Sequence, residues 1–216
     1  MRILAIDSST EACSVALFEG ADLTGADLVD GHFEVIGRGH AERLVPMIAR
    51  LPDRGRADLI AVSLGPGSFT GVRVGLAAAK ALALAWRVPV SGYSTLALVA
   101  AIACRETGAA AAGVAMAGGH GEWFVQSLTA DGMPLGQCAS LIPAEAAVQV
   151  REPLVAGNRA EELVALRTSG TAIALLPDAR RLPLLSQAGF TTDVRPQYGR
   201  PPDARIATVG VTGAAA

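Results

Sequence analysis

GPGSFTGVRVG, residues Gly65–Gly75, joins the apolar run Leu59–Leu64 to a long apolar segment that ends near Trp86. A buried strand, a glycine-rich turn and a helix in this order are typical of α/β proteins. Glycine lets the backbone adopt positive φ and approach a neighbour closely, and a helix N-terminus offers free N–H groups. The stretch therefore predicts either a site for an anion or partner, or a tight turn that begins a structural helix.

The spacing within this stretch excludes three familiar motifs. A P-loop needs Lys followed by Ser or Thr, and neither pair occurs between Gly65 and Gly71. The dinucleotide pattern G-x-G-x-x-G would place its last glycine at Thr70. The nucleophile elbow G-x-S-x-G would need a glycine two residues before Ser68, and Pro66 stands there. Ser68 is therefore not expected to be a nucleophile.

The predicted helix after the turn is apolar on nearly every face. From Val72 to Trp86 only Arg73 and Lys80 are polar, and their spacing of seven puts them on one stripe. Such a helix is buried on more than one side. A sheet can cover one side. Another domain or another chain would cover the rest, unless the helix lies at the centre of one large core.

The order of predicted elements gives the fold. The first half has a strand hairpin, a third strand, and then helix, strand, helix and strand, at residues 2–6, 12–18, 34–37, 40–50, 59–64, 72–86 and 88–90. After a helix over 94–104, the second half repeats this order at 111–116, 122–129, 135–139, 143–150, 153–157, 158–167 (with Asn158 as N-cap) and 172–176. We predict an α/β, duplicated actin-like (ASKHA, ribonuclease H-like) fold with two lobes of mixed sheets flanked by helices. The expected divisions are an N-terminal lobe 1–92, a C-terminal lobe 93–190 and an extended tail 191–216.

Composition indicates a well-packed protein without a strong electrostatic field. The 216 residues are 51% hydrophobic and 18% charged, with a net charge of −2, so no global attraction to nucleic acid is expected. Cys13, Cys104 and Cys138 have no zinc or disulfide spacing, which favours reduced thiols in the cytoplasm. Asp7 comes too early for a signal peptide. Charged residues interrupt the longest apolar segment, so no membrane span is expected.

Several segments together resemble the TsaB (YeaZ) family. They are residues 1–16, MRILAIDSSTEACSVA, the elbow Gly65–Gly75 and the later Ser94-Thr95-Leu96. The resemblance covers most of the chain, is strongest in the first hundred residues and is weaker after Gly108. Tail residues Tyr198 and Arg200–Ala204 also resemble the end of this family.

The resemblance implies a function. Family members are non-catalytic partners of a TsaD-like transferase in the synthesis of threonylcarbamoyladenosine (t6A) beside the anticodon of tRNA. It implies pairing through the N-terminal lobes, a third TsaE-like ATPase, tRNA held through the complex, and a homodimer when the protein is alone. It implies no cofactor of its own, with ATP or ADP at the interface of the complex.

The residues agree with a lost active site. A metal-binding relative would carry H-x-x-x-H, but only His40 stands at the start of the predicted helix, and Leu44 holds the second position. The second half has Ala117 and Gly119 where relatives have Asp and Arg, which removes a ligand for a magnesium–phosphate group. We therefore expect no catalytic residue and no metal ligand.

Two sets of candidate site residues follow. Asp7 either orients a cation or water near a phosphate or caps a turn through its own carboxylate, and the second role is favoured. The nucleotide-binding candidates are Asp7, Ser8, Ser9, Gly65, Gly67 and Ser68. The candidates for a partner interface, a helix bundle between two chains, are His40, Arg43, Leu44, Met47, Ile48, Val72, Arg73, Leu76 and Lys80.

Two alternatives stay open. One is an enzyme acting alone, a weak ATPase or a glycoprotease-like hydrolase, in which Ser68 and His40 would meet but a third partner has no candidate. The other is direct tRNA binding through a thin basic footprint with few aromatic residues, made of Arg73, Lys80, Arg195, Arg200 and Arg205.

Overall fold

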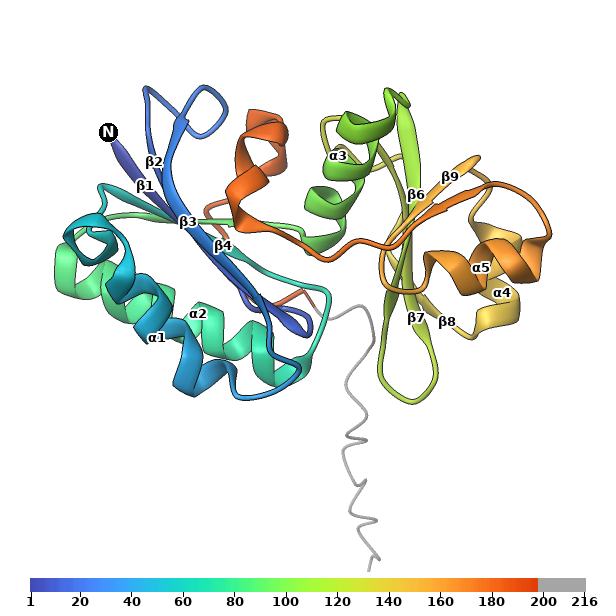
Figure 1. Ribbon diagram of the computed structural model, residues 1–216, viewed down its shortest axis with the longest axis horizontal. Coiled ribbons are helices and arrows are strands. Elements are labelled where there is room, and N and C mark those ends of the chain that lie inside the picture. The colour runs from blue at the N-terminus through green and yellow to red at the C-terminus, as the bar shows by residue number, and fades with distance from the viewer. Residues whose placement is uncertain (198–216) are drawn as a thin grey trace, which may run out of the picture.

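The computed structural model describes residues 1–197. It contains two five-stranded sheets (Figure 1). The first half of the chain forms β1 (Arg2–Asp7), β2 (Ala12–Glu19), β3 (Asp27–Val35), α1 (His40–Arg50), η1 (Pro52–Gly55), β4 (Leu59–Ser63), α2 (Phe69–Trp86) and β5 (Val90–Tyr93). After α3 (Thr95–Thr107) come β6 (Ala111–Ala117), β7 (Trp123–Thr129), β8 (Ala139–Leu141), α4 (Pro143–Gln149), β9 (Leu154–Ala156), α5 (Ala160–Arg167), β10 (Thr171–Ile173), η2 (Ala179–Leu184) and η3 (Gln187–Gly189).

The two sheets have the same topology. The strand orders are β3-β2-β1-β4-β5 and β8-β7-β6-β9-β10. In each half the first three strands form an antiparallel meander. The fourth strand pairs parallel with the free edge of the first strand, and the fifth pairs parallel with the fourth. This is the duplicated actin-like (ribonuclease H-like) arrangement, so the fold predicted from the element order is confirmed.

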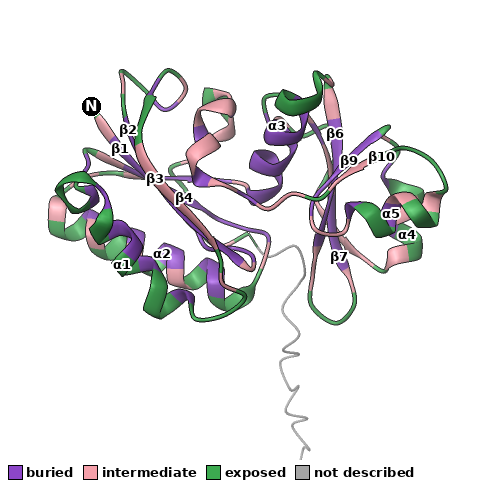
Figure 2. Cartoon of the chain, in the orientation of Figure 1, coloured by how far each residue is buried: buried purple, intermediate pink, exposed green. Residues whose placement is uncertain are grey.

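Helices cover both faces of both sheets. Helices α1 and α2 lie on the outer face of the first sheet, and α4 and α5 on the outer face of the second. Helix α3 lies between the sheets, and ten consecutive residues of it, Thr95–Cys104, are buried. Figure 2 shows this burial as an unbroken purple stretch in α3, in contrast to the partly green helices on the outside.

The chain returns to the first lobe after β10. The Ala179 N–H donates to Ser14 Oγ on β2 at 3.0 Å, and Gly92 on β5 exchanges backbone hydrogen bonds with Thr191. Residues 179–191 therefore lie against the first sheet, although most of them were assigned from the sequence to the second lobe. The division of the chain into 1–92, 93–190 and 191–216 stays a prediction, and its tail beyond Gln197, including Tyr198, Arg200 and Arg205, lies outside the described residues.

Most element bounds agree with the sequence to within a few residues. The strand expected around 34–37 is longer and earlier, because β3 pairs along the whole of β2 from Ala12 to Glu19. Helix α2 begins at Phe69, three residues before the predicted start, because Ser68 is its N-cap. Strand β8 lies at Ala139–Leu141 rather than 135–139, since its register is set by pairing with β7.

Candidate functional site

The glycine-rich elbow lies where β4 ends and α2 begins, beside the turn between β1 and β2. Ser68 Oγ accepts the Gly71 N–H at 3.3 Å and so caps the helix. The facing turn consists of Asp7, Ser8, Ser9 and Thr10, all buried, with exposed fractions of 1%, 2%, 0% and 7%. The predicted nucleotide-binding residues are therefore brought together in one place.

The turn occupies the space beside the elbow. The Ser68 N–H donates to Ser9 O at 2.6 Å, and Ser8 Oγ donates to Gly71 O at 2.9 Å. A Cβ added at Gly67 would lie 2.1 Å from Ser9 O, and one at Gly71 would lie 2.1 Å from Ser8 O. Glycine is needed here because the chain's own backbone approaches so closely. This contact accounts for the glycines of the elbow without a ligand.

Asp7 stabilises this turn from within. Its Oδ1 accepts the N–H of Ser9 at 2.9 Å and the hydroxyl of Ser9 at 2.6 Å. The Tyr93 hydroxyl lies 3.3 Å from the other carboxylate oxygen. Burial raises the pKa of Asp7 above its usual range, although these hydrogen bonds act in the opposite direction. The geometry is that of an Asx turn, which supports the structural role favoured from the sequence.

Hydroxyl groups extend this buried network to α3. Thr95 Oγ1 donates to Ser9 Oγ at 2.9 Å and lies 2.6 Å from Ser63 Oγ at the end of β4. All three residues are buried. The β1–β2 turn, β4 and α3 thus share one cluster of buried hydroxyl groups, which bond to one another rather than face solvent.

The apolar residues predicted for the partner interface are in the core of the first lobe. Leu44, Met47, Ile48, Val72 and Leu76 are at most 5% exposed and pack between α1, α2 and the outer face of the first sheet. They cannot themselves touch another protein in this conformation, which corrects the expectation that they form the contact surface. The apolar face of α1 is covered by the sheet of its own chain.

His40 is also buried, and its Nε2 lies 3.3 Å from Ala12 O. The polar members of the predicted interface remain at the surface. Arg43 pairs with Glu34 at 2.7 Å, and Arg73 and Lys80 are exposed on α2. Ser68 is engaged in capping α2 and His40 in a contact with β2, so neither is oriented as a hydrolase pair would require.

The outer face of α2 is exposed and carries large apolar side chains, a feature that was not expected from the sequence. Phe69 is 61% exposed and Leu84 82% exposed, and Val45 on the neighbouring α1 is 57% exposed. The guanidinium of Arg73 lies over the Phe69 ring, 3.2 Å from its centre. Spacings of three and four residues place Phe69, Arg73, Ala77, Lys80 and Leu84 on one face. This spacing is the signal in the sequence from which the exposed face of α2 could have been predicted.

Helix α2 is long and apolar enough, by length and composition alone, to cross a membrane. Its mean hydropathy is 1.3, and 33% of it is buried. No membrane span was expected from the sequence, because Arg73, Lys80 and Arg87 interrupt the longest apolar segment. The opposite face of α2 packs on β4 and α1, as a helix of a globular domain does.

Within residues 1–197 no group of three His, Cys, Asp or Glu side chains is placed to hold a metal ion. In the second half, Gly118 begins the β6–β7 turn and its N–H donates to Glu122 O at 2.8 Å. A Cβ at Gly118 would lie 2.7 Å from that oxygen, so glycine is required by the hairpin, whereas Gly119 has open space around it.

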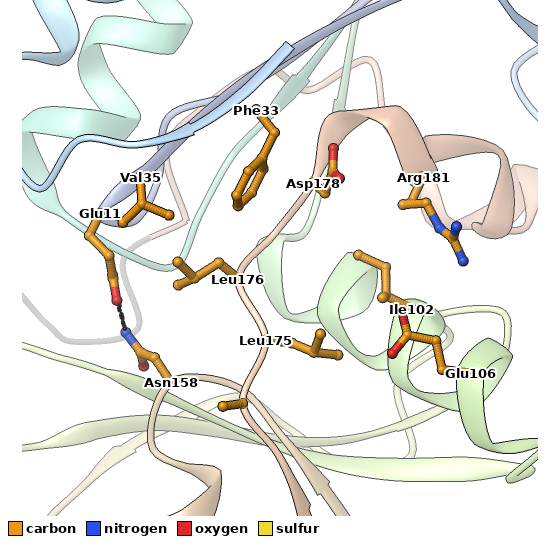
Figure 3. Close-up of a pocket in the computed structure, with 11 residues that line it drawn as sticks. Glu11, Phe33, Val35, Ile102, Glu106, Asn158, Leu175, Leu176, Asp178 and Arg181 are labelled. Atoms are coloured by element: carbon orange, nitrogen blue, oxygen red, sulfur yellow. Dashed lines mark hydrogen bonds between the residues drawn. The ribbon is translucent and has the colours of Figure 1, made fainter. Parts of the chain in front are cut away.

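Asn158 joins the two lobes instead of capping a helix. Arg159 is the N-cap residue of α5, and the Asn158 side chain accepts the Ala117 N–H at 2.8 Å. Its amide donates to both oxygens of Glu11, which belongs to the β1–β2 turn (Figure 3). This corrects the expected capping role: the Asn158 side chain forms hydrogen bonds with Ala117 and Glu11 instead of capping α5.

A family model and two relatives that this chain resembles have related names, all of which concern threonylcarbamoyladenosine in tRNA. Residues 33–207 match the family model described as TsaD, tRNA N6-adenosine threonylcarbamoyltransferase. The tRNA threonylcarbamoyladenosine biosynthesis protein TsaB of Escherichia coli is 44% identical over 114 residues, which are 50% of this chain and 47% of that protein. The TsaB of Bacillus subtilis is 36% identical over 106 residues, 47% of this chain and 44% of that protein. The matches thus span about half the length of these curated relatives.

Solved structures extend the similarity to nearly the whole chain. A Pseudomonas aeruginosa protein described as similar to peptidase YeaZ is 33% identical, with a TM-score of 0.75 over 92% of this chain and 99% of that one. YeaZ from Pseudomonas aeruginosa is 34% identical, with a TM-score of 0.70 over 84% and 88%. With its duplicated sheets and its closed glycine elbow, the chain belongs to the TsaB (YeaZ) family.

Proposed function

We propose that this protein is a non-catalytic partner of a TsaD-type transferase in the t6A modification of tRNA. The observation that carries the proposal is the exposed face of α2, which presents Phe69 near one end of the helix and Leu84 near the other. Large exposed apolar side chains bordered by polar groups are typical of contact surfaces on soluble proteins. The names of the curated relatives supply the pathway.

The composition of this face indicates how a partner would bind. Large apolar side chains at the two ends of α2, with Ala77 and Ala81 between them, allow another helix to approach closely and pack ridges into grooves. The basic groups of Arg73 and Lys80 lie on the same face and suit carboxylates at the rim of the partner surface. The buried residues of α1 and α2 would act indirectly, by fixing the position of this face.

The closed elbow supports the absence of catalysis by this chain alone. The space beside Gly67 and Gly71 is filled by Ser9 and Ser8, where a phosphate would have to lie. We therefore place ATP or ADP at the interface of the complex rather than inside this chain. We also assign a TsaE-like ATPase and tRNA to the assembled complex, a homodimer to the lone protein, and the cytoplasm as the compartment.

The test is a binding measurement with the TsaD-type transferase of the same genome, both proteins purified, by calorimetry. Leu84→Glu should weaken binding at least about tenfold, because a charge would replace the most exposed apolar side chain of the face. Leu166→Glu is the matched control: Leu166 is 53% exposed on α5 of the other lobe. Both variants should fold, since both side chains are exposed.

Two outcomes would refute the proposal. One is the absence of binding by the unaltered chain under conditions where both proteins are folded. The other is equal binding by the unaltered chain and Leu84→Glu, which would place the interface elsewhere. A separate titration tests where the nucleotide binds. ATP is added to the lone chain and to the mixture of the two proteins, and only the mixture should show binding heat.

A further inference from the structure

A pocket of about 550 Å³ lies between the two lobes (Figure 3). None of its lining residues belongs to α2 or to the glycine elbow, so it is separate from the proposed partner surface. Its volume is within the range of about 300–1,000 Å³ that is typical of small-molecule sites, which often lie between domains. It is formed by β3, α3 and the segment 174–178 that crosses from the second lobe to the first.

The walls of this pocket are mainly apolar. Phe33 comes from β3, Ile102 from α3, and Leu175 and Leu176 from the crossing segment. Figure 3 shows these four side chains around one central space. Ile102 is 4% exposed and anchored in the core, so this wall is fixed by the fold. An apolar ligand body would remove this surface from water.

Acidic groups outnumber basic ones in the lining. Asp178 is neutralised by the guanidinium of Arg180, which contacts both its oxygens at 2.7–3.0 Å. Within residues 1–197, the carboxylate of Glu11 accepts hydrogen bonds from the neutral amide of Asn158 alone. Glu106, within the described part of the chain, has no hydrogen bond or ion pair. Among the described residues, the lining carboxylates of Glu11 and Glu106 thus have no cationic partner, and Arg181 is the lining residue that carries a guanidinium.

We propose that this pocket binds a small organic amine, an apolar body that carries one ammonium or guanidinium group. The apolar body would lie against Phe33 and Leu175, and the cation would pair with Glu106 or Glu11. A carboxylate or phosphate ligand would meet the same two carboxylates and be repelled. This site goes beyond the partner role and does not depend on it.

The probes are benzylamine, benzyl alcohol and benzoate, which share one apolar body and differ in charge. Each is titrated into isotope-labelled full-length protein, and two-dimensional NMR follows the backbone amides of Ile102 and Leu175. At low salt, benzylamine should bind about two- to fivefold more tightly than benzyl alcohol, as expected for one partly exposed ion pair. Benzoate should bind more weakly than both. Added salt should reduce the advantage of the amine.

Glu106→Gln tests the role of charge without altering packing, because Glu106 is exposed near the end of α3. It should reduce the advantage of benzylamine over benzyl alcohol. Arg105→Gln, an exposed neighbour outside the lining, is the matched control and should retain that advantage. The proposal is overturned if benzylamine leaves Ile102 and Leu175 unshifted, if the three probes bind equally, or if the two variants behave alike.

Discussion

The side-chain amide of Asn158 donates to both carboxylate oxygens of Glu11, at 2.8 and 3.1 Å, across 147 residues of sequence. The same side chain accepts the Ala117 N–H at the end of β6. One residue of the second lobe therefore satisfies a backbone donor of its own sheet and a carboxylate of the other lobe. This makes it a point at which the two lobes are held together.

Asn158→Ala should lower the free energy of unfolding by about 1–3 kcal/mol, because a part-buried N–H and a carboxylate would both lose their partner. Denaturant unfolding followed by circular dichroism measures this. Glu161→Ala, at an exposed position nearby on α5, should change stability by less than about 0.5 kcal/mol. Equal stability of the two variants would show that the interlobe contact contributes nothing.

Asn158→Asp separates charge from geometry at the same place. The new carboxylate can still accept the Ala117 N–H but faces the carboxylate of Glu11, so it should destabilise the protein. Adding Glu11→Gln restores a donor opposite Asp and should recover part of the loss. A double variant that is no more stable than Asn158→Asp alone would contradict the assigned contact.

Gly71→Ala should destabilise the protein by about 1–3 kcal/mol, the usual cost of overpacking. Its Cβ would lie 2.1 Å from Ser8 O, which is backbone and cannot move aside easily. Gly119→Ala, with nothing within 4 Å, is the control and should change stability by less than about 0.5 kcal/mol. Thermal unfolding of both variants tests whether the elbow glycines serve packing.

The elbow shows which features could be predicted from the sequence and which could not. Its glycines and the apolar run before it predicted a strand, a turn and a helix, because those signals are local. Whether a ligand or the chain itself fills the elbow depends on Ser8 and Ser9, more than fifty residues earlier, and no local pattern encodes that approach.

The apolar residues of the predicted interface lie inside the protein for a related reason. The periodic spacing of Leu44, Met47 and Ile48 shows that one face of α1 is buried, but it does not show what covers that face. The first sheet covers it. The exposed face of α2 could have been found from its spacing. It was not located because almost every residue of α2 is apolar, so the two faces differ little.

Asp7 should make stability depend on pH in an unusual direction. Its pKa in the folded protein is raised above the ordinary 3.8, so between these two values the folded state binds more protons than the unfolded state. Its contribution to stability therefore falls as pH rises through this window and is constant above it. Other carboxylates, such as Glu34, have lowered pKa values and act in the opposite direction.

Asp7→Asn isolates this contribution, because Asn still offers an oxygen to the Ser9 donors but does not titrate. The unfolding free energy of Asp7→Asn minus that of the unaltered protein should increase with pH from about 3.8 upward and then level off. Denaturant unfolding at a series of pH values measures the difference. A difference that is flat or decreases with pH would mean that Asp7 is not held in the surroundings described.

The lone protein should self-associate through the face of α2 around Leu84, since that apolar side chain is 82% exposed. Leu84→Glu should raise the dimer dissociation constant at least about tenfold in sedimentation experiments, and Leu166→Glu should not. A two-fold symmetric contact uses the same patch of both copies, so the positive charges of Arg73 and Lys80 from both copies would lie in one interface. Added salt should then strengthen this dimer, whereas it should weaken the contact with a partner that offers carboxylates to the same face. A dimer unaffected by Leu84→Glu would show that self-association uses another surface, even if the transferase binds here.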